Sequence, residues 1–149
     1  MQTAVSPFLQ KLDSIEANLE AQAYKLIAEI QEKILDFVRE EQLYKKGIDG
    51  KGVRLEPYSP YTIALKKFKG EVYNRTTLLD TGDFYDNMYV HARDRMYFVE
   101  SSDYKSDMLK DKYGDSIMVL TDKHNKIINE QEILPRLVQW MIKQLFGTT

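Results

Sequence analysis

Residues 7–46 read PFLQKLDSIEANLEAQAYKLIAEIQEKILDFVREEQLYKK, and no glycine or proline interrupts this stretch after its first residue. Ser6 is a favourable N-cap, and Pro7 suits the first position of a helix. Gaps of three and four residues place one set of apolar side chains on a single helix face. They are Leu12, Ile15, Leu19, Ala23, Leu26, Ile30, Ile34 and Phe37. The pattern predicts a long N-terminal helix over residues 7–44, about 57 Å in length. Such a helix either breaks near Ala21–Ala23 or has part of its stripe buried by another subunit. The simpler alternative is a helix that covers the core of its own chain.

The composition bounds the classes of protein to which this chain can belong. Its 149 residues, 43% hydrophobic and 30% charged, are typical of one globular domain spanning residues 1–149. The absence of cysteine excludes disulfides, cysteine-ligated metal centres and thiol catalysis. No apolar run is long enough for a transmembrane helix, so we expect no membrane association. The 10 tyrosines indicate protein contacts, because tyrosine combines apolar area with a polar tip.

Charge divides the chain into three segments. Residues 1–44 carry a net charge of −4 and residues 76–149 a net charge of −3, whereas residues 45–75 carry +5. Within this basic segment, Ser59 or Pro60 can open a short helix that ends at Gly70. The predicted interface residues of the segment are basic or aromatic: Arg54, Tyr58, Tyr61, Lys66, Lys67, Phe68, Lys69 and Arg75. We therefore expect a projecting basic loop or arm that contacts an acidic protein surface, or nucleic acid by phosphate contacts and base stacking.

The last segment, residues 76–149, predicts an α+β body. Phe84–Ala92 and Arg95–Glu100 read as a small antiparallel hairpin, and Ser116–Leu120 reads as a third strand. The whole chain is therefore assigned to the α+β class.

Two helices are also expected in this segment, over residues 104–113 and at the C-terminus. The C-terminal helix is amphipathic and starts near Ile133 or Leu134, since Pro135 fits only a first turn. Its apolar face is expected to pack against the hairpin. The residues of that face are Leu137, Trp140, Met141 and Leu145.

The sequence offers little catalytic chemistry. Asp80, Thr81, Gly82 and Asp83 read as a structural turn in which the glycine takes a backbone angle that other residues avoid. Asp80, Asp83 and Asp86 could instead hold a divalent cation, but the oxygen spacing of a calcium loop is missing. We predict no catalytic residue, no metal and no cofactor. A metal-dependent nuclease that uses these carboxylates is the alternative to be tested.

Four short motifs occur in an order that resembles small virion proteins of tailed bacteriophages. The motifs are Leu43–Gly52 (LYKKGIDGKG), Tyr58–Ile63 (YSPYTI), Lys66-Lys67 and Leu78–Tyr85 (LLDTGDFY). The resemblance covers roughly residues 40–90. It is to phage morphogenesis, tail-completion and neck (head–tail connector) proteins, including those in phages of Bacteroides-type hosts.

The resemblance implies a non-enzymatic virion protein of the neck or tail, assembled in the cytoplasm of the bacterial host. The implied partners are other copies of itself in a ring, the portal, and other neck or tail proteins, with possible contact to packaged DNA. A ring needs two different complementary surfaces on each copy. The acidic helix and the basic loop could supply them. A nucleic-acid-binding module that uses the same loop is the second reading.

Overall fold

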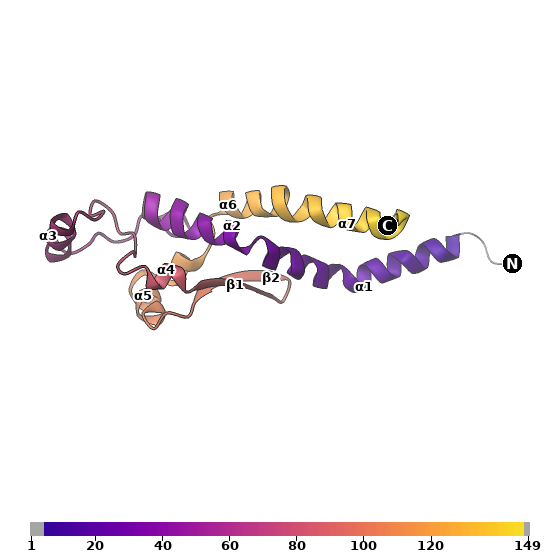
Figure 1. Ribbon diagram of the computed structural model, residues 1–149, viewed down its shortest axis with the longest axis horizontal. Coiled ribbons are helices and arrows are strands. Elements are labelled where there is room, and N and C mark those ends of the chain that lie inside the picture. The colour runs from indigo at the N-terminus through magenta and orange to yellow at the C-terminus, as the bar shows by residue number, and fades with distance from the viewer. Residues whose placement is uncertain (1–4, 148–149) are drawn as a thin grey trace.

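The structure is a computed structural model that describes residues 5–147. The chain is elongated (Figure 1). Helix α3 (Pro60–Lys69) lies at one end, and helix α1 (Val5–Glu29) starts near the other. A long N-terminal helix, a small antiparallel sheet and a C-terminal helix are all present, so the α+β prediction is confirmed.

The N-terminal rod bends once. Of the alternatives for the long helix, a break at residues 21–23 is wrong, because α1 runs on to Glu29 and the bend lies at Ile30, whose φ is −103° and ψ is 11°. Helix α2 (Gln31–Asp36) follows, and a wider π-helical segment, η1 (Phe37–Lys46), completes the rod. Gly47 ends it in the left-handed conformation at φ +59°. The rod is thus slightly longer than predicted, and its side chains from Ile27 to Leu43 supply much of the core.

The C-terminal rod lies antiparallel beside α1 (Figure 1). It consists of α6 (Asp122–Ile127), the π-helical η3 (Ile128–Ile133) and α7 (Leu134–Phe146), with Pro135 in the first turn of α7 as expected. The predicted packing of α7 on the sheet is wrong, because α7 contacts α1 instead. No α7 side chain is fully buried, and the four predicted core residues, Leu137, Trp140, Met141 and Leu145, are half-buried.

The sheet is a single hairpin of β1 (Met88–Arg93) and β2 (Met96–Ser101), paired from Met88↔Ser101 to Arg93↔Met96. Its two-residue turn, Asp94-Arg95, has φ of +53° and +60°, the signature of a tight hairpin turn. The first strand begins at Met88 rather than at the predicted Phe84, because the short helix α4 (Asp83–Asp86) occupies the preceding residues. One face of β1 packs against α1 and α2, which leaves no room there for α7.

The predicted third strand at residues 116–120 is also wrong. After helix α5 (Ser106–Tyr113), Gly114 turns the chain at φ +92° into a 3₁₀ turn, η2 (Asp115–Met118). Ile117 and Met118 enter the core from this turn. A short apolar run looks the same in a buried strand and in a buried turn, so periodicity cannot distinguish them.

A buried polar residue joins the two rods at the centre of the core. The Gln42 side chain is fully buried, donates to the Val119 carbonyl at 2.9 Å and accepts from the Thr121 amide at 2.9 Å. The same Oε1 lies 2.9 Å from Nδ1 of His124. Each polar atom of this side chain therefore has a partner, as burial requires. Across the described residues, no helix is both long and apolar enough to cross a membrane.

Candidate protein-docking arm

Most of the basic segment (residues 45–75) lies in an arm, which we define as residues 47–79. The arm leaves the end of η1 and returns to α4. Helix α3 occupies its outer end (Figure 1). Leu55, Thr76 and Thr77 are buried at its base, and the Thr76 hydroxyl donates to the Glu56 carbonyl at 2.5 Å. The base of the arm is thus part of the folded body, and only its outer part projects.

The turn at the start of the arm is built around Asp49. Its Oδ1 accepts from the amides of Lys51 and Val53 at 2.9 Å, and its Oδ2 accepts from the Ser116 hydroxyl at 2.8 Å. Burial acts to raise the pKa of the Asp49 carboxyl, but these hydrogen bonds outweigh burial and hold the pKa below its ordinary value. The turn is therefore fixed to η2 as well as to itself.

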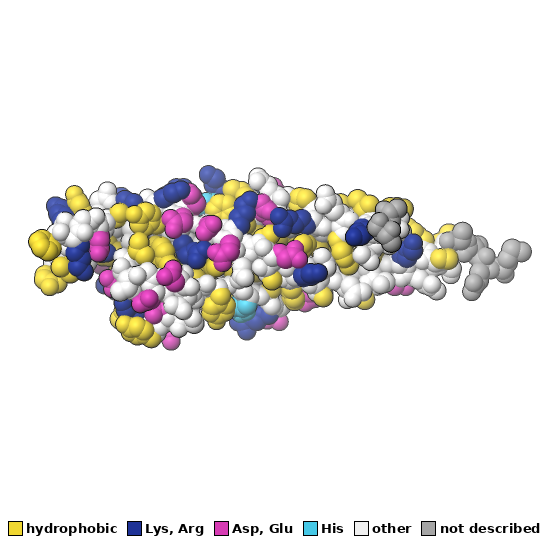
Figure 2. Space-filling model, in the orientation of Figure 1, with side chains coloured by type: hydrophobic (Ala, Val, Ile, Leu, Met, Phe, Trp, Pro, Cys, Tyr) yellow, Lys and Arg dark blue, Asp and Glu magenta, His cyan; other side chains and the backbone are white. Residues whose placement is uncertain are grey.

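Helix α3 forms as the sequence predicts. Ser59 is its N-cap and accepts from the Thr62 amide at 3.2 Å, Pro60 occupies the first turn, and Gly70 ends the helix at φ +72°. Tyr61, Leu65 and Phe68 follow at gaps of four and three residues and lie on one side of α3. Tyr61 is 77% exposed, Leu65 40% and Phe68 90%. Figure 2 shows hydrophobic and basic side chains gathered at this end of the molecule.

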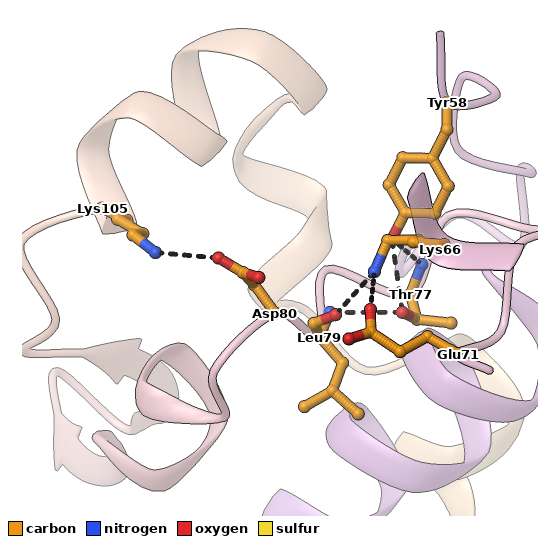
Figure 3. Close-up of polar contacts among 7 residues, drawn as sticks. All are labelled: Tyr58, Lys66, Glu71, Thr77, Leu79, Asp80 and Lys105. Atoms are coloured by element: carbon orange, nitrogen blue, oxygen red, sulfur yellow. Dashed lines mark hydrogen bonds and ion pairs between the residues drawn. The ribbon is translucent and has the colours of Figure 1, made fainter. Parts of the chain in front are cut away.

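Another side of α3 is turned toward the rest of the arm, and Lys66 lies on this side (Figure 3). The Lys66 ammonium donates to Glu71 Oε2 at 3.2 Å and to the Leu79 carbonyl at 3.1 Å, and it lies 5.0 Å from the centre of the Tyr58 ring. The Tyr58 hydroxyl in turn accepts from the Thr77 amide at 3.0 Å. Lys66 and Tyr58 were both predicted to lie in the interface. The prediction is wrong for Lys66, which is 8% exposed. Tyr58 is half-buried.

Arg75 also has an internal position. Its Nε donates to the Tyr44 carbonyl at 2.6 Å, its Nη1 donates to Asn74 at 2.8 Å, and its guanidinium lies 5.8 Å from the Tyr44 ring. Arg75 therefore fastens the returning segment of the arm, residues 71–79, to η1. Of the eight predicted interface residues, those that are exposed are Arg54, Tyr61, Lys67, Phe68 and Lys69.

Leu65 is an exposed apolar residue of α3 that the sequence prediction did not include among the interface residues. Its gap of four residues from Tyr61 and three from Phe68 was the available signal, because such gaps share a helix face. The exposed face of α3 thus consists of Tyr61, Leu65 and Phe68, with Lys67 and Lys69 as its exposed cations. Leu65 and Lys69 lie at the edge of this face, where they also line the cavity between α3 and the body. We call these five residues the α3 face.

Between α3 and the body lies a cavity of about 320 Å³, and one side of it is the predicted structural turn of residues 80–83. Gly82 has φ +96°, which confirms its special backbone angle, and Asp83 begins α4. The Thr81 hydroxyl accepts from the Asp83 amide at 3.3 Å, and the Asp80 carboxylate pairs with Lys105 at 3.2 Å (Figure 3). The element that follows is a helical turn rather than a strand.

The carboxylates of this turn do not converge. Among residues 5–147, no group of three histidine, cysteine, aspartate or glutamate side chains is placed to hold a metal ion, and this includes Asp80, Asp83 and Asp86. The geometry of the region favours packing and hydrogen bonding.

Comparisons with protein families, with curated proteins and with solved structures found no match.

Proposed function

We propose that this protein is a structural virion protein of a tailed phage, a head–tail connector or tail-completion subunit that assembles into a ring below the portal. The observation that supports this most is the α3 face. Two aromatic rings and a leucine lie on a capped helix at the end of the molecule, exposed to solvent. Exposed apolar groups that share one surface are typical of protein interaction sites.

The internal contacts of the arm support the same reading. Lys66, Glu71 and Tyr58 hold α3 in one orientation before any partner arrives. A helix that is positioned in advance loses less conformational freedom on binding, so more of its contact energy appears as affinity. The arm is therefore suited to docking, and no chemical step is required of it.

The proposed partners are other copies of this chain, the portal, and further neck or tail proteins, in the virion and in the bacterial cytoplasm during assembly. Lys67 and Lys69 are exposed beside the aromatic residues, so the receiving surface should carry carboxylates. Burial of these cations without a partner charge would oppose binding.

The test compares a variant that lacks the two aromatic side chains of the α3 face with a variant that lacks an exposed tyrosine elsewhere. The double variant Tyr61→Ser/Phe68→Ser is supplied in place of the wild-type protein during phage assembly, with Tyr104→Ser as control. Tyr104 is 84% exposed but lies outside the arm. We expect both proteins to fold, and only the control to appear in purified virions by immunoblot. Normal incorporation of the double variant would contradict the proposal.

A nucleic-acid-binding module is the second candidate, because cations and exposed aromatic rings also occur together in single-strand binding proteins. Titration of the purified protein with DNA distinguishes the two. Binding that weakens steeply with salt, and is lost in Lys67→Glu/Lys69→Glu, would favour the nucleic-acid reading.

A further inference from the structure

A groove of about 1190 Å³ lies on the body, away from the arm. It is lined by residues of α1, of β2 and the hairpin turn, of α5 and η2, and of α6, η3 and the start of α7. No residue of the arm lines it. The apolar residues of its lining include Leu19, Ala23, Ile27, Met118, Ile133 and Leu137.

The charged residues that line this groove are mostly acidic. Five are carboxylates and two are cations, which leaves a formal charge of −3. The carboxylates are Glu16, Glu20, Glu100, Asp115 and Asp122. Of the two cations, Arg95 already lies 3.7 Å from Glu20. Glu16 and Asp115 are exposed and form no ion pair within residues 5–147. The groove therefore combines an apolar lining with two carboxylates, Glu16 and Asp115, that form no ion pair among the described residues.

We propose that this groove receives the α3 face of a neighbouring copy of the chain. The inference rests on the proposed ring assembly and names the surface that completes it. Anchors at positions i, i+4 and i+7 are the pattern by which an amphipathic helix binds a hydrophobic groove. Tyr61, Leu65 and Phe68 supply the anchors, while Lys67 and Lys69 supply charges opposite to those of Glu16 and Asp115.

A second apolar surface fits α3 less well. Leu134, Val138, Ile142 and Phe146 form an exposed stripe along α7, at gaps of four residues. However, α7 carries Arg136 and Lys143 and no acidic residue. Because these cations would repel Lys67 and Lys69, the charge of the surface selects the groove over the stripe.

The two surfaces differ and lie on separate parts of one copy, so their contact is heterologous. Heterologous contacts join copies head to tail, and they close into a ring when the rotation between copies permits. In a closed ring, the groove of each copy would bind the α3 face of the next copy.

Cysteine crosslinking tests the contact directly, because the natural chain contains no cysteine. Ala64→Cys lies on exposed α3 between Tyr61 and Phe68, and Ala23→Cys lies in the groove. The two single variants are purified as full chains, mixed and treated with a short bismaleimide. Ala28→Cys is the matched control, since Ala28 is exposed on the same helix as Ala23 but does not line the groove.

We expect a covalent dimer from the Ala64→Cys and Ala23→Cys mixture, at least tenfold more abundant than from Ala64→Cys with Ala28→Cys. Equal yields from the two mixtures, or a preference for a cysteine at Ile142 on the α7 stripe, would overturn the inference. A purified chain that stays monomeric and gives no crosslink would overturn it as well.

Charge reversal supplies an independent readout by sedimentation. Glu16→Lys/Asp115→Lys and Lys67→Glu/Lys69→Glu should each reduce self-association at least tenfold, and a mixture of the two variants should restore it. Failure of the mixture to recover would contradict the pairing. If crosslinking and rescue succeed but the protein is absent from virions, the docking contact stands and the proposed phage function fails. If virions contain the protein but the crosslink does not form, the function stands and this contact fails.

Discussion

Lys66 and Glu71 form an ion pair, 3.2 Å from Nζ to Oε2, that joins the inner side of α3 to the segment of the arm that follows it. The Leu79 carbonyl is the second acceptor of the same ammonium, at 3.1 Å. One basic residue of the arm therefore orients α3, while its neighbour Lys67 is exposed. The two lysines differ in role although they are adjacent in sequence.

Replacement of these lysines should separate the two roles. Lys66→Met leaves the Leu79 carbonyl and the Glu71 carboxylate without their buried partner, so we expect the free energy of unfolding to fall by about 1–3 kcal/mol. Lys67→Met changes an exposed side chain and should stay within about 0.5 kcal/mol of wild type. Urea denaturation followed by circular dichroism measures both. Equal effects of the two substitutions would show that the ion pair does not hold α3.

Gly50 tests the contact between the first turn of the arm and the loop after η2. A Cβ added at Gly50 would lie 2.5 Å from the Val119 carbonyl oxygen and 2.7 Å from the Val119 Cβ. Because backbone must move to relieve such contacts, Gly50→Ala should cost about 3 kcal/mol.

Gly52→Ala is the control for that substitution. Gly52 has φ +75° but no atom within 4 Å of an added Cβ, so only backbone strain of about 1 kcal/mol is expected. Thermal unfolding of the two variants, at equal concentration, gives the comparison. A Gly50→Ala variant as stable as Gly52→Ala would show that the turn does not pack closely on Val119.

The parts of this fold that depend on local chemistry could be predicted from the sequence. Ser59, Pro60 and Gly70 bound α3 as capping preferences indicate, and the polar turn of the hairpin follows from Asp94. The left-handed angle of Gly82 was equally predictable. In each case a few adjacent residues determine the conformation, so no tertiary information is needed.

The parts that depend on tertiary contacts could not be predicted. The π-helical end of the rod and the bend at Ile30 arise where α2 and η1 pack on the body, and no glycine or proline marks them. The interior position of Lys66 depends on Glu71 and Leu79 returning beside α3. The net charge of residues 45–75 could not show which of their cations already bind groups of the same chain, as Lys66 and Arg75 do.

Trp140 shows how the packing of α7 changes an expected stability effect. A fully buried tryptophan replaced by alanine costs about 3–5 kcal/mol, but Trp140 is half-buried, on a helix that packs against α1. We therefore expect Trp140→Ala to cost about 1–2 kcal/mol by urea denaturation. Ile142→Ala, at a position 51% exposed on the same helix, should cost less than about 0.5 kcal/mol. A loss above 3 kcal/mol at Trp140 would mean that α7 is more deeply packed than its exposure indicates.

We expect His124 to make the free energy of unfolding dependent on pH. Its ring is stacked on Phe37 at 4.3 Å between centroids, and its Nδ1 lies 2.9 Å from the Gln42 Oε1. Burial lowers the pKa of His124 below its ordinary value, and the charges of Lys46 and Lys123 lower it further. The ring is therefore neutral in the folded chain at a pH where the unfolded chain already binds a proton.

The sign of the effect follows from this difference in bound protons. As the pH falls below about 6.5, the unfolded chain takes up a proton that the folded chain excludes, so the free energy of unfolding decreases. The decrease ends when the pH falls below the pKa of His124 in the folded state. We expect His124→Gln to show a shallower decrease between pH 7.5 and pH 5.5 in urea titrations, and His91→Gln to retain the contribution of His124. An unchanged slope in His124→Gln would show that this histidine does not link proton binding to folding.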